Sequence, residues 1–219
     1  MALVVVSTPI GNPEDISKHA LSAIEAAELV IGEERKVTTK FLKQYGLTGR
    51  PVELLNEHSD QQDLDFLLAE CKAKQVALIS DCGTPGFCDP GADLVDACYR
   101  HGVAVAAAPG ASSLMTFLSL TGRRLDQFLF RGFLPANNEK RSRAWNDLKK
   151  DRWPIILMDT PYRLAKTVEE ACKVFPNAEF ILGYRLTFED QKIIRGKASQ
   201  VQQAIQGLKG EFLLLIING

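Results

Sequence analysis

The chain has 219 residues, of which 46% are hydrophobic and 24% charged, a composition typical of a globular protein with a sizeable core. Its formal net charge is −1, so no strong overall field would draw it to nucleic acid, and any basic surface must be local. Five cysteines and three histidines show no Cys-x-x-Cys spacing, so we expect no zinc site. No apolar run is long enough to cross a bilayer and no signal-peptide pattern is visible, so we expect a cytoplasmic protein with reduced thiols.

In the first half of the chain, short apolar runs alternate with helical patterns. The runs that predict strands are residues 2–6, 29–31, 52–55, 76–79 and 103–107. Between them, apolar side chains recur at helical spacing, as in Leu64, Leu67 and Leu68. Strands that alternate with helices predict a parallel sheet covered on both faces.

Single residues near the ends of these helices carry further expectations. Gly46 suits the position just past a helix end, and Asp60 suits an N-cap. Asp89 and Pro90 suit the start of the helix after the fourth strand. His19 falls on or near the apolar face of its helix, so we expect it to be packed rather than functional.

A polar loop of residues 80–91 follows the fourth predicted strand, and the rest of the chain is organised around it. Its glycines would let a ligand approach the backbone, and its prolines fix the path of the chain. Asp81 is at the strand tip, where open α/β sheets bind ligands, and would offer a buried charged acceptor. The alternative from spacing alone is a tight connection without a ligand, because glycine and proline are common in all turns.

The second half of the chain has a less regular pattern. Strands are predicted at residues 127–131, 155–158, 180–183, 193–196 and 212–217. A domain boundary near residue 110 would give an N-terminal α/β domain of residues 1–110 and a C-terminal α/β domain of residues 111–219.

A basic segment runs from residue 131 to residue 152. Seven basic residues stand there against three acidic ones, a local excess of four positive charges. With Trp145 among them, this segment could follow a phosphate backbone and stack a base. The alternative is a solvated amphipathic helix.

The central loop reads Ser-Asp-Cys-Gly-Thr-Pro from residue 80 and Asp-Pro-Gly from residue 89. This pattern closely resembles the signature loop of the tetrapyrrole methylase superfamily, which holds S-adenosylmethionine. The Thr-Pro-Ile-Gly-Asn of residues 8–12 and the Pro-Gly-Ala-Ser of residues 109–112 resemble the family's other cofactor loops. The resemblance implies a tetrapyrrole-methylase-like fold, with two α/β domains and a cofactor cleft between them.

The resemblance also implies a set of cofactor-binding residues. They stand at positions that match the family's binding loops: Pro9, Ile10, Asp81, Gly83, Thr84, Ser112, Ser113 and Met158. A Rossmann methyltransferase would need a Gly-x-Gly loop after the first strand, and residues 7–12 contain a single glycine.

Two further loops resemble the branch of the superfamily that methylates a ribose 2′-hydroxyl in small-subunit ribosomal RNA. Residues 33–38 match that branch at Glu33 and Thr38, with Lys36 in place of an arginine, and residues 56–60 match it at Glu57 and His58. A weak hydroxyl nucleophile benefits from a base or from a cation that stabilises developing alkoxide. Glu33, Lys36, Glu57 and His58 are therefore the candidate catalytic residues.

We expect an S-adenosylmethionine-dependent methyltransferase that acts on ribosomal RNA in the small subunit, with no metal. The superfamily's usual assembly implies a homodimer. Two alternatives remain open: a methyltransferase for a macrocycle such as a precorrin, and a non-catalytic protein that binds S-adenosylmethionine or RNA. Substitutions in the motifs of the resembling branch keep the second alternative open, at Arg35, Lys36, Asn56, Tyr162, Tyr184 and Arg185.

Overall fold

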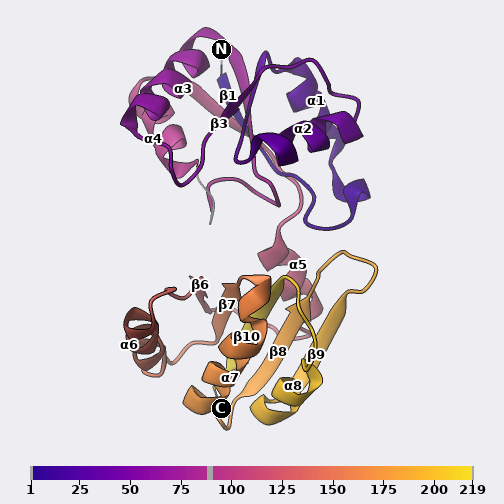
Figure 1. The fold of residues 1–219 in the computed structure, drawn as a ribbon, viewed down its shortest axis with the longest axis vertical. Helices are drawn as coiled ribbons and strands as arrows, with labels where there is room; N and C mark the ends of the chain where they lie inside the picture. The colour runs from indigo at the N-terminus through magenta and orange to yellow at the C-terminus, as the bar shows by residue number, and fades with distance from the viewer. Residues whose placement is uncertain (1, 88–90, 219) are drawn as a thin grey trace. The chain divides into compact units, whose positions relative to one another are not determined.

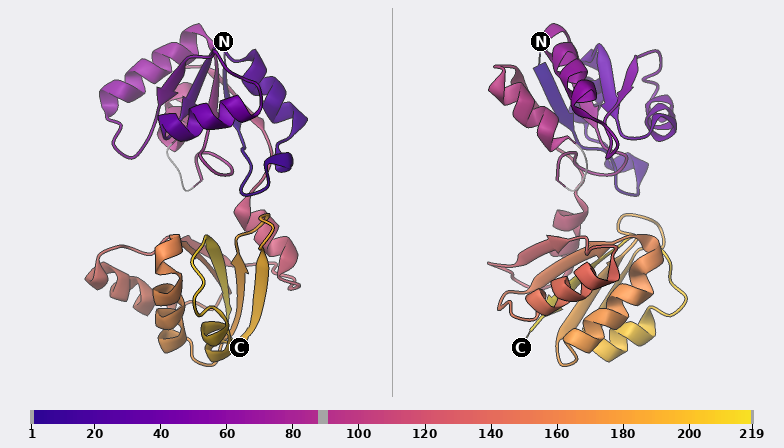
Figure 2. Two further views of the ribbon diagram at one scale, coloured as in Figure 1. Left: turned by 45° about the vertical axis from the view of Figure 1, so that its right-hand side comes forward. Right: turned by 60° about the vertical axis from the view of Figure 1, so that its left-hand side comes forward.

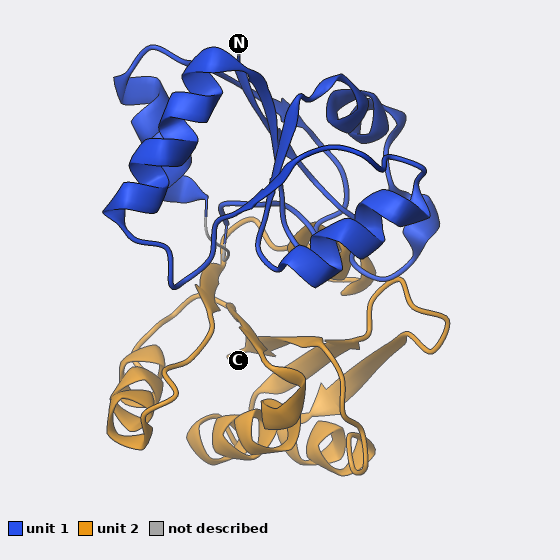
Figure 3. Ribbon diagram, turned by 45° about the horizontal axis from the view of Figure 1, so that its top comes forward, with its two compact units in different colours: residues 1–112 blue, residues 113–219 orange. Residues whose placement is uncertain are grey.

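A computed structural model describes residues 2–87 and 91–218 of the chain. The chain divides into two compact units, unit 1 (residues 1–112) and unit 2 (residues 113–219), which are coloured separately in Figure 3. The boundary expected near residue 110 falls just before this division. Each unit has its own five-stranded sheet, so both halves are α/β.

The sheet of unit 1 is parallel, as the alternating pattern predicts. Its strands are β1 (Ala2–Val6), β2 (Leu29–Gly32), β3 (Val52–Leu54), β4 (Gln75–Ile79) and β5 (Ala104–Ala108). They lie in the order β3-β2-β4-β1-β5, and each neighbouring pair is parallel. Strand β1 therefore lies between β4 and β5, so the ends of these three strands are neighbours at one edge of the sheet.

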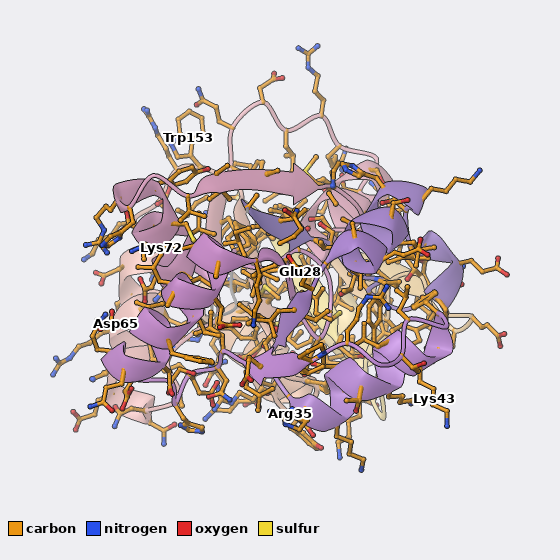
Figure 4. The ribbon with its side chains drawn as sticks, turned by 90° about the horizontal axis from the view of Figure 1, so that it is seen from above. Glu28, Arg35, Lys43, Asp65, Lys72 and Trp153 are labelled. Atoms are coloured by element: carbon orange, nitrogen blue, oxygen red, sulfur yellow. The ribbon has the colours of Figure 1, made fainter. Side chains whose placement is uncertain are left out.

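Helices cover both faces of this sheet. They are η1 (Pro13–Asp15), α1 (Lys18–Ala26), α2 (Arg35–Gln44), α3 (Gln61–Ala73) and α4 (Ala92–Arg100). Helices α3 and α4 pack on one face around Leu3 and Ile31, and α1 and α2 pack on the other around Val6 and Val30 (Figure 1). The opposite surfaces of the helices are polar, and Figure 4 labels two of their exposed side chains, Lys43 on α2 and Asp65 on α3.

The helix ends test the expectations for single residues. Asp60 caps α3, since its side chain accepts hydrogen bonds from the backbone N–H groups of Gln62 and Asp63, and Gly46 takes a φ of +71° just after α2. Both predictions are confirmed. The packed position expected for His19 is wrong, because its side chain is exposed on α1. Asp89 and Pro90 lie outside the described residues.

The sheet of unit 2 is mixed. Its strands are β6 (Leu129–Gly132), β7 (Ile155–Asp159), β8 (Glu179–Tyr184), β9 (Lys192–Lys197) and β10 (Phe212–Ile217). The order is β6-β7-β10-β8-β9, with β6 parallel to β7 and the other pairs antiparallel. The sequence predicts all five strands, and the bounds of four of them shift by one or two residues.

The helices of unit 2 are α5 (Ser113–Leu120), α6 (Asn138–Leu148), η2 (Pro161–Arg163), α7 (Leu164–Val174) and α8 (Ala198–Ala204). Helices α6, α7 and α8 pack on one face of the sheet in a single apolar core (Figure 2). Helix α5 contributes the fully buried Phe117, whose ring lies so close to Gly183 on β8 that an added Cβ would be 2.7 Å from it. A side chain at position 183 would therefore displace α5.

The basic segment is divided by the fold. Arg141 is only 2% exposed, and its guanidinium donates to Asp159 (3.0 Å), Glu170 (2.6 Å) and the Thr167 hydroxyl (2.7 Å). Trp145 is 4% exposed, and its indole N–H donates to Glu170. The prediction that Trp145 stacks a base is wrong, and Arg141, one of the seven basic residues of the segment, cannot contact a phosphate backbone, because both side chains belong to the core of unit 2.

Several other features bear on the class of the protein. Among the described residues, no group of three or more His, Cys, Asp or Glu side chains could hold a metal ion. No helix in residues 2–87 and 91–218 is both long and apolar enough to cross a membrane. Burial raises the pKa of the Cys71 thiol to about 12, so this thiol stays protonated and unreactive at neutral pH.

The buried Arg141 pairs yield a stability prediction. Arg141→Met should lower the free energy of unfolding by about 3–5 kcal/mol, because it removes the nearest cation from the carboxylates of Asp159 and Glu170. The cations that remain, Arg163 for Asp159 (3.5 Å) and Lys166 for Glu170 (3.9 Å), are farther away and more exposed. Lys149→Met, an exposed change at the end of the same helix, should stay within about 0.5 kcal/mol. Denaturant unfolding of both variants measures the difference, and equal midpoints and slopes would contradict the structural role of Arg141.

Candidate functional site at the carboxyl edge of unit 1

Three loops leave the sheet of unit 1 at the same level. In the parallel register, Val6 of β1 is opposite Ile79 of β4 and Ala108 of β5. The loops that begin at Ser7, Ser80 and Pro109 are therefore neighbours in space, although they are far apart in the sequence. This is the edge at which open parallel sheets bind ligands.

Thr8 joins the first two loops. Its hydroxyl donates to the carbonyl of Ser80 (3.0 Å) and accepts from the backbone N–H of Gly83 (3.1 Å). Its own N–H donates to the carbonyl of Gly83 (2.8 Å). Thr8 is 2% exposed, so these bonds satisfy backbone groups that water does not reach. The β1 and β4 loops are thus held as one unit.

Thr84 extends this connection to the third loop. Its hydroxyl donates to the carbonyl of Ala111 (3.2 Å) and lies 2.8 Å from the hydroxyl of Ser7. Because the Thr84 proton serves Ala111, Ser7 is the donor in the second bond. Gly110 packs so closely on Ser7 that an added Cβ would lie 3.0 Å from the Ser7 Cβ. All three loops therefore share one polar network.

Gly83 lies under Ile10 at the centre of these loops. Its φ of +85° is in the left-handed region that favours glycine, and an added Cβ would be 3.3 Å from the Ile10 side chain. Ile10 is buried, while Thr84 is exposed. A side chain at position 83 would strain the backbone and push Ile10 away.

Glu33, at the end of β2, braces the Asp81 loop. Its carboxylate oxygen Oε1 accepts hydrogen bonds from the Ser80 hydroxyl (2.6 Å) and from the backbone N–H of Asp81 (3.0 Å). Asp81 is exposed, so the expectation of a buried carboxylate is wrong: in this structure the tip of the loop faces water. Glu33 fixes the backbone from which the Asp81 side chain projects.

Helix α2 is pinned close to Glu33. An added Cβ at Gly32 would overlap the side chain of Thr38, which is 1% exposed, so only glycine admits this approach. The Arg35 guanidinium donates to the carbonyl of Val52 on β3 (2.8 Å). The residue that departs from the family pattern at position 35 thus has a structural role.

The other candidate catalytic residues have fewer contacts with these loops. Lys36 is exposed in the first turn of α2. Glu57 and His58 lie in the turn after β3 with their side chains exposed, and His58 Nε2 is 3.9 Å from Glu57 Oε1. Asn56 links this turn to the β2 loop, since its side-chain amide donates to the carbonyl of Glu33 (3.4 Å).

The predicted cofactor residues fall into two groups. Those that the structure brings together on unit 1 are Pro9, Ile10, Asp81, Gly83, Thr84 and Ser112. Ser113 and Met158 belong to unit 2, where Ser113 opens α5 and Met158 is on β7. Sequence reasoning missed the linking roles of Ser7, Thr8 and Ser80. The available signal was a pair of polar residues directly after a fully apolar strand.

These features define a protein with a parallel α/β unit that has a candidate ligand site at the carboxyl edge of its sheet. The family model of tetrapyrrole (corrin/porphyrin) methylases matches residues 2–202. The chain belongs to this family, in the branch of the ribosomal RNA small subunit methyltransferase I proteins.

The curated relatives cover nearly the whole chain. The ribosomal RNA small subunit methyltransferase I of Neisseria meningitidis serogroup B is 32% identical over 98% of this chain and 75% of its own length. The protein of the same name from Rickettsia prowazekii is 34% identical over 98% of this chain and 77% of its own length. That of Thermotoga maritima is 33% identical over 90% of this chain and 89% of its own.

Solved structures show the same fold at lower identity. The uroporphyrin-III-C-methyltransferase of Thermus thermophilus has a TM-score of 0.68 at 19% identity, covering 99% of this chain and 94% of its own. A diphthine synthase has a TM-score of 0.72 at 14% identity, covering 99% and 90%. The tetrapyrrole-methylase fold expected from the sequence is confirmed.

The hydrogen bonds that Glu33 accepts yield a prediction that distinguishes two roles of this residue, positioning the Ser80–Asp81 backbone and transferring a proton. Glu33→Gln keeps an oxygen acceptor for Ser80 and Asp81, so methyl transfer should stay within about tenfold of the parent. Loss of a general base would cost roughly 10²–10⁴-fold and change the pH–rate profile. Glu33→Ala removes both bonds and should raise KM for the cofactor more than it lowers kcat. A loss of about 10²-fold or more in kcat for Glu33→Gln would assign Glu33 to proton transfer.

Proposed function

We propose that the chain is an S-adenosylmethionine-dependent methyltransferase that methylates a ribose 2′-hydroxyl of small-subunit ribosomal RNA. The observation that carries this proposal is the similarity, over nearly the full chain, to proteins named ribosomal RNA small subunit methyltransferase I. The loops at residues 33–38 and 56–60, which resemble the ribose-methylating branch, support the same substrate. The protein acts in the cytoplasm, as a homodimer.

The polar groups at the edge of unit 1 suit the cofactor. S-adenosylmethionine carries a cationic sulfonium, an ammonium and ribose hydroxyls, all of which favour acceptors such as the Asp81 carboxylate and backbone carbonyls. Gly83 leaves the backbone open to close approach. The residues of unit 1 that would hold the cofactor are Pro9, Ile10, Asp81, Gly83, Thr84 and Ser112. Ser113 and Met158, which belong to unit 2, stay predictions from the family resemblance.

When bound, S-adenosylmethionine supplies an electrophilic methyl group on sulfur. The protein then has to align the hydroxyl with that methyl group for in-line displacement, and such positioning contributes about 7–11 kcal/mol in favourable cases. The hydrogen bonds of Thr8 and Thr84 link the cofactor loops to one another, which reduces the conformational entropy lost on binding. The exposed Lys36, Glu57 and His58 reach solvent, where an RNA substrate can meet them.

The three exposed residues Lys36, Glu57 and His58 have different roles in activating the ribose hydroxyl. Glu57 or His58 takes the proton of the attacking hydroxyl, and Lys36 stabilises the charge that develops on its oxygen. A lysine keeps the positive charge of the arginine that the branch carries at this position, but it loses the planar two-point grip on phosphate.

Methyl transfer to ribosomal subunits tests the proposed function. Small ribosomal subunits from a strain that lacks the gene should accept labelled methyl groups from S-adenosylmethionine, and mass spectrometry should place the label on a ribose. Subunits from the parent strain, already modified, serve as the control and should accept none. Label on a macrocycle but not on the subunits, or cofactor binding without any transfer, would contradict the proposal.

Cofactor binding yields a separate prediction for Asp81. Asp81→Ala should weaken binding of S-adenosylmethionine by about 1.5–3 kcal/mol, a Kd increase of roughly 10–150-fold, because a charged hydrogen-bond acceptor is lost. Asp65→Ala removes an equal charge from the exposed surface of α3 and should leave the Kd unchanged. Titration calorimetry measures both, and an unchanged Kd for Asp81→Ala would remove Asp81 from the binding site.

A further inference from the structure

A bulge in the edge strand of unit 2 presents one basic residue of the segment 131–152. Strand β6 pairs with β7 through Phe130 and Ile156 and then through Gly132 and Leu157, so Arg131 is the extra residue. Gly132 takes a φ of +65°, which accommodates the irregularity. Arg131 and Leu129 both line the space between this strand and helix α6.

Between β6 and α6 lies a pocket of about 420 Å³. Its apolar part is formed by Leu129, Pro135, Ala144 and Leu148, and its charged part by Arg131, Lys140, Arg143, Asp147 and Asp151. This volume is within the range of sites that hold small organic groups. The pocket thus combines an apolar wall with a charged rim.

The ion pairs of the segment leave a positive balance at this pocket. Arg141 forms ion pairs with Asp159 and Glu170 in the core, and Lys150 pairs with Asp147 (2.9 Å). Arg152 lies over the ring of Trp153, 4.6 Å from its centre; Trp153 is labelled in Figure 4.

Within residues 2–87 and 91–218, no ion pair is found for the three basic residues that line the pocket, Arg131, Lys140 and Arg143. Of the two acidic residues, Asp147 is neutralised by Lys150. The pocket therefore carries three cations that form no ion pair within the described residues, against the single carboxylate of Asp151, and this arrangement attracts anions. Arg131 Nη1 also donates to the carbonyl of Phe133 (3.3 Å).

We propose that this pocket binds a phosphodiester group of the RNA substrate, with the attached ribose against the apolar wall. The inference rests on the proposed function, and it names the part of unit 2 that grips the substrate backbone. Arg131 supplies a planar set of N–H donors that matches phosphate oxygens, and Lys140 and Arg143 add charge from one side of α6. Such contacts position an RNA without reading its sequence.

The test is the salt dependence of binding to small ribosomal subunits from the gene-deleted strain. The double variant Lys140→Gln and Arg143→Gln, both exposed on α6, should raise the Kd roughly tenfold or more and reduce the slope of log K against log salt by about 1–2. Lys149→Gln with Lys192→Gln is the matched control: it removes the same charge from outside the pocket, and Lys192 is on β9 at the opposite edge of the sheet.

The control should keep the slope of the parent, and calorimetry should show unchanged binding of S-adenosylmethionine in both variants. A pocket variant with the slope of the parent, or an equal loss in the control, overturns the inference even when ribose methylation is observed. If the subunits accept no methyl group but the pocket variant alone loses salt-dependent binding, the proposed function fails while the phosphodiester site stands.

Discussion

The candidate site depends on one buried hydroxyl, that of Thr8. Three strand ends meet at the same edge, and the loops that leave them bring backbone donors and acceptors together around Ser7, Thr8 and Ser80, which are at most 4% exposed. Unpaired groups there would be costly. The Thr8 hydroxyl serves Ser80 and Gly83 at once, and Thr84 and Glu33 extend the same network to the β5 and β2 loops. The loops can therefore be rigid without being part of the sheet.

Unit 2 meets a different constraint, because its core contains a full positive charge. Burying Arg141 is tolerable only with carboxylates in contact, and Asp159 and Glu170 come from β7 and α7. This arrangement joins α6 to the rest of the unit by ion pairs as well as by the packing of Trp145. It also separates the basic segment into a structural cation inside and a set of surface cations outside. The surface set is the one that can meet a polyanion.

Local signals in the sequence were sufficient for most of the fold. Apolar runs predicted every strand, and their alternation with helices predicted that the sheet of unit 1 is parallel, because these features depend on neighbours in the chain. The order of the strands was not predicted. Gly46 and Asp60 were also predictable, since a helix end is satisfied within a few residues. The loop motifs located the site residues of unit 1 by resemblance, and the register of the sheet brings those loops to a common edge.

The sequence by itself thus determined the strands, the family and the loops of the candidate site. Tertiary structure decided which side chains are inside: His19 is exposed, while Arg141 and Trp145 are buried. It also decided that Glu33 braces the Asp81 loop, because Ser80 and Asp81 follow a different strand. The physical reason is common to these cases. Periodicity records what a residue's neighbours in the chain are, whereas burial, ion pairing and hydrogen bonding depend on partners that only folding brings near.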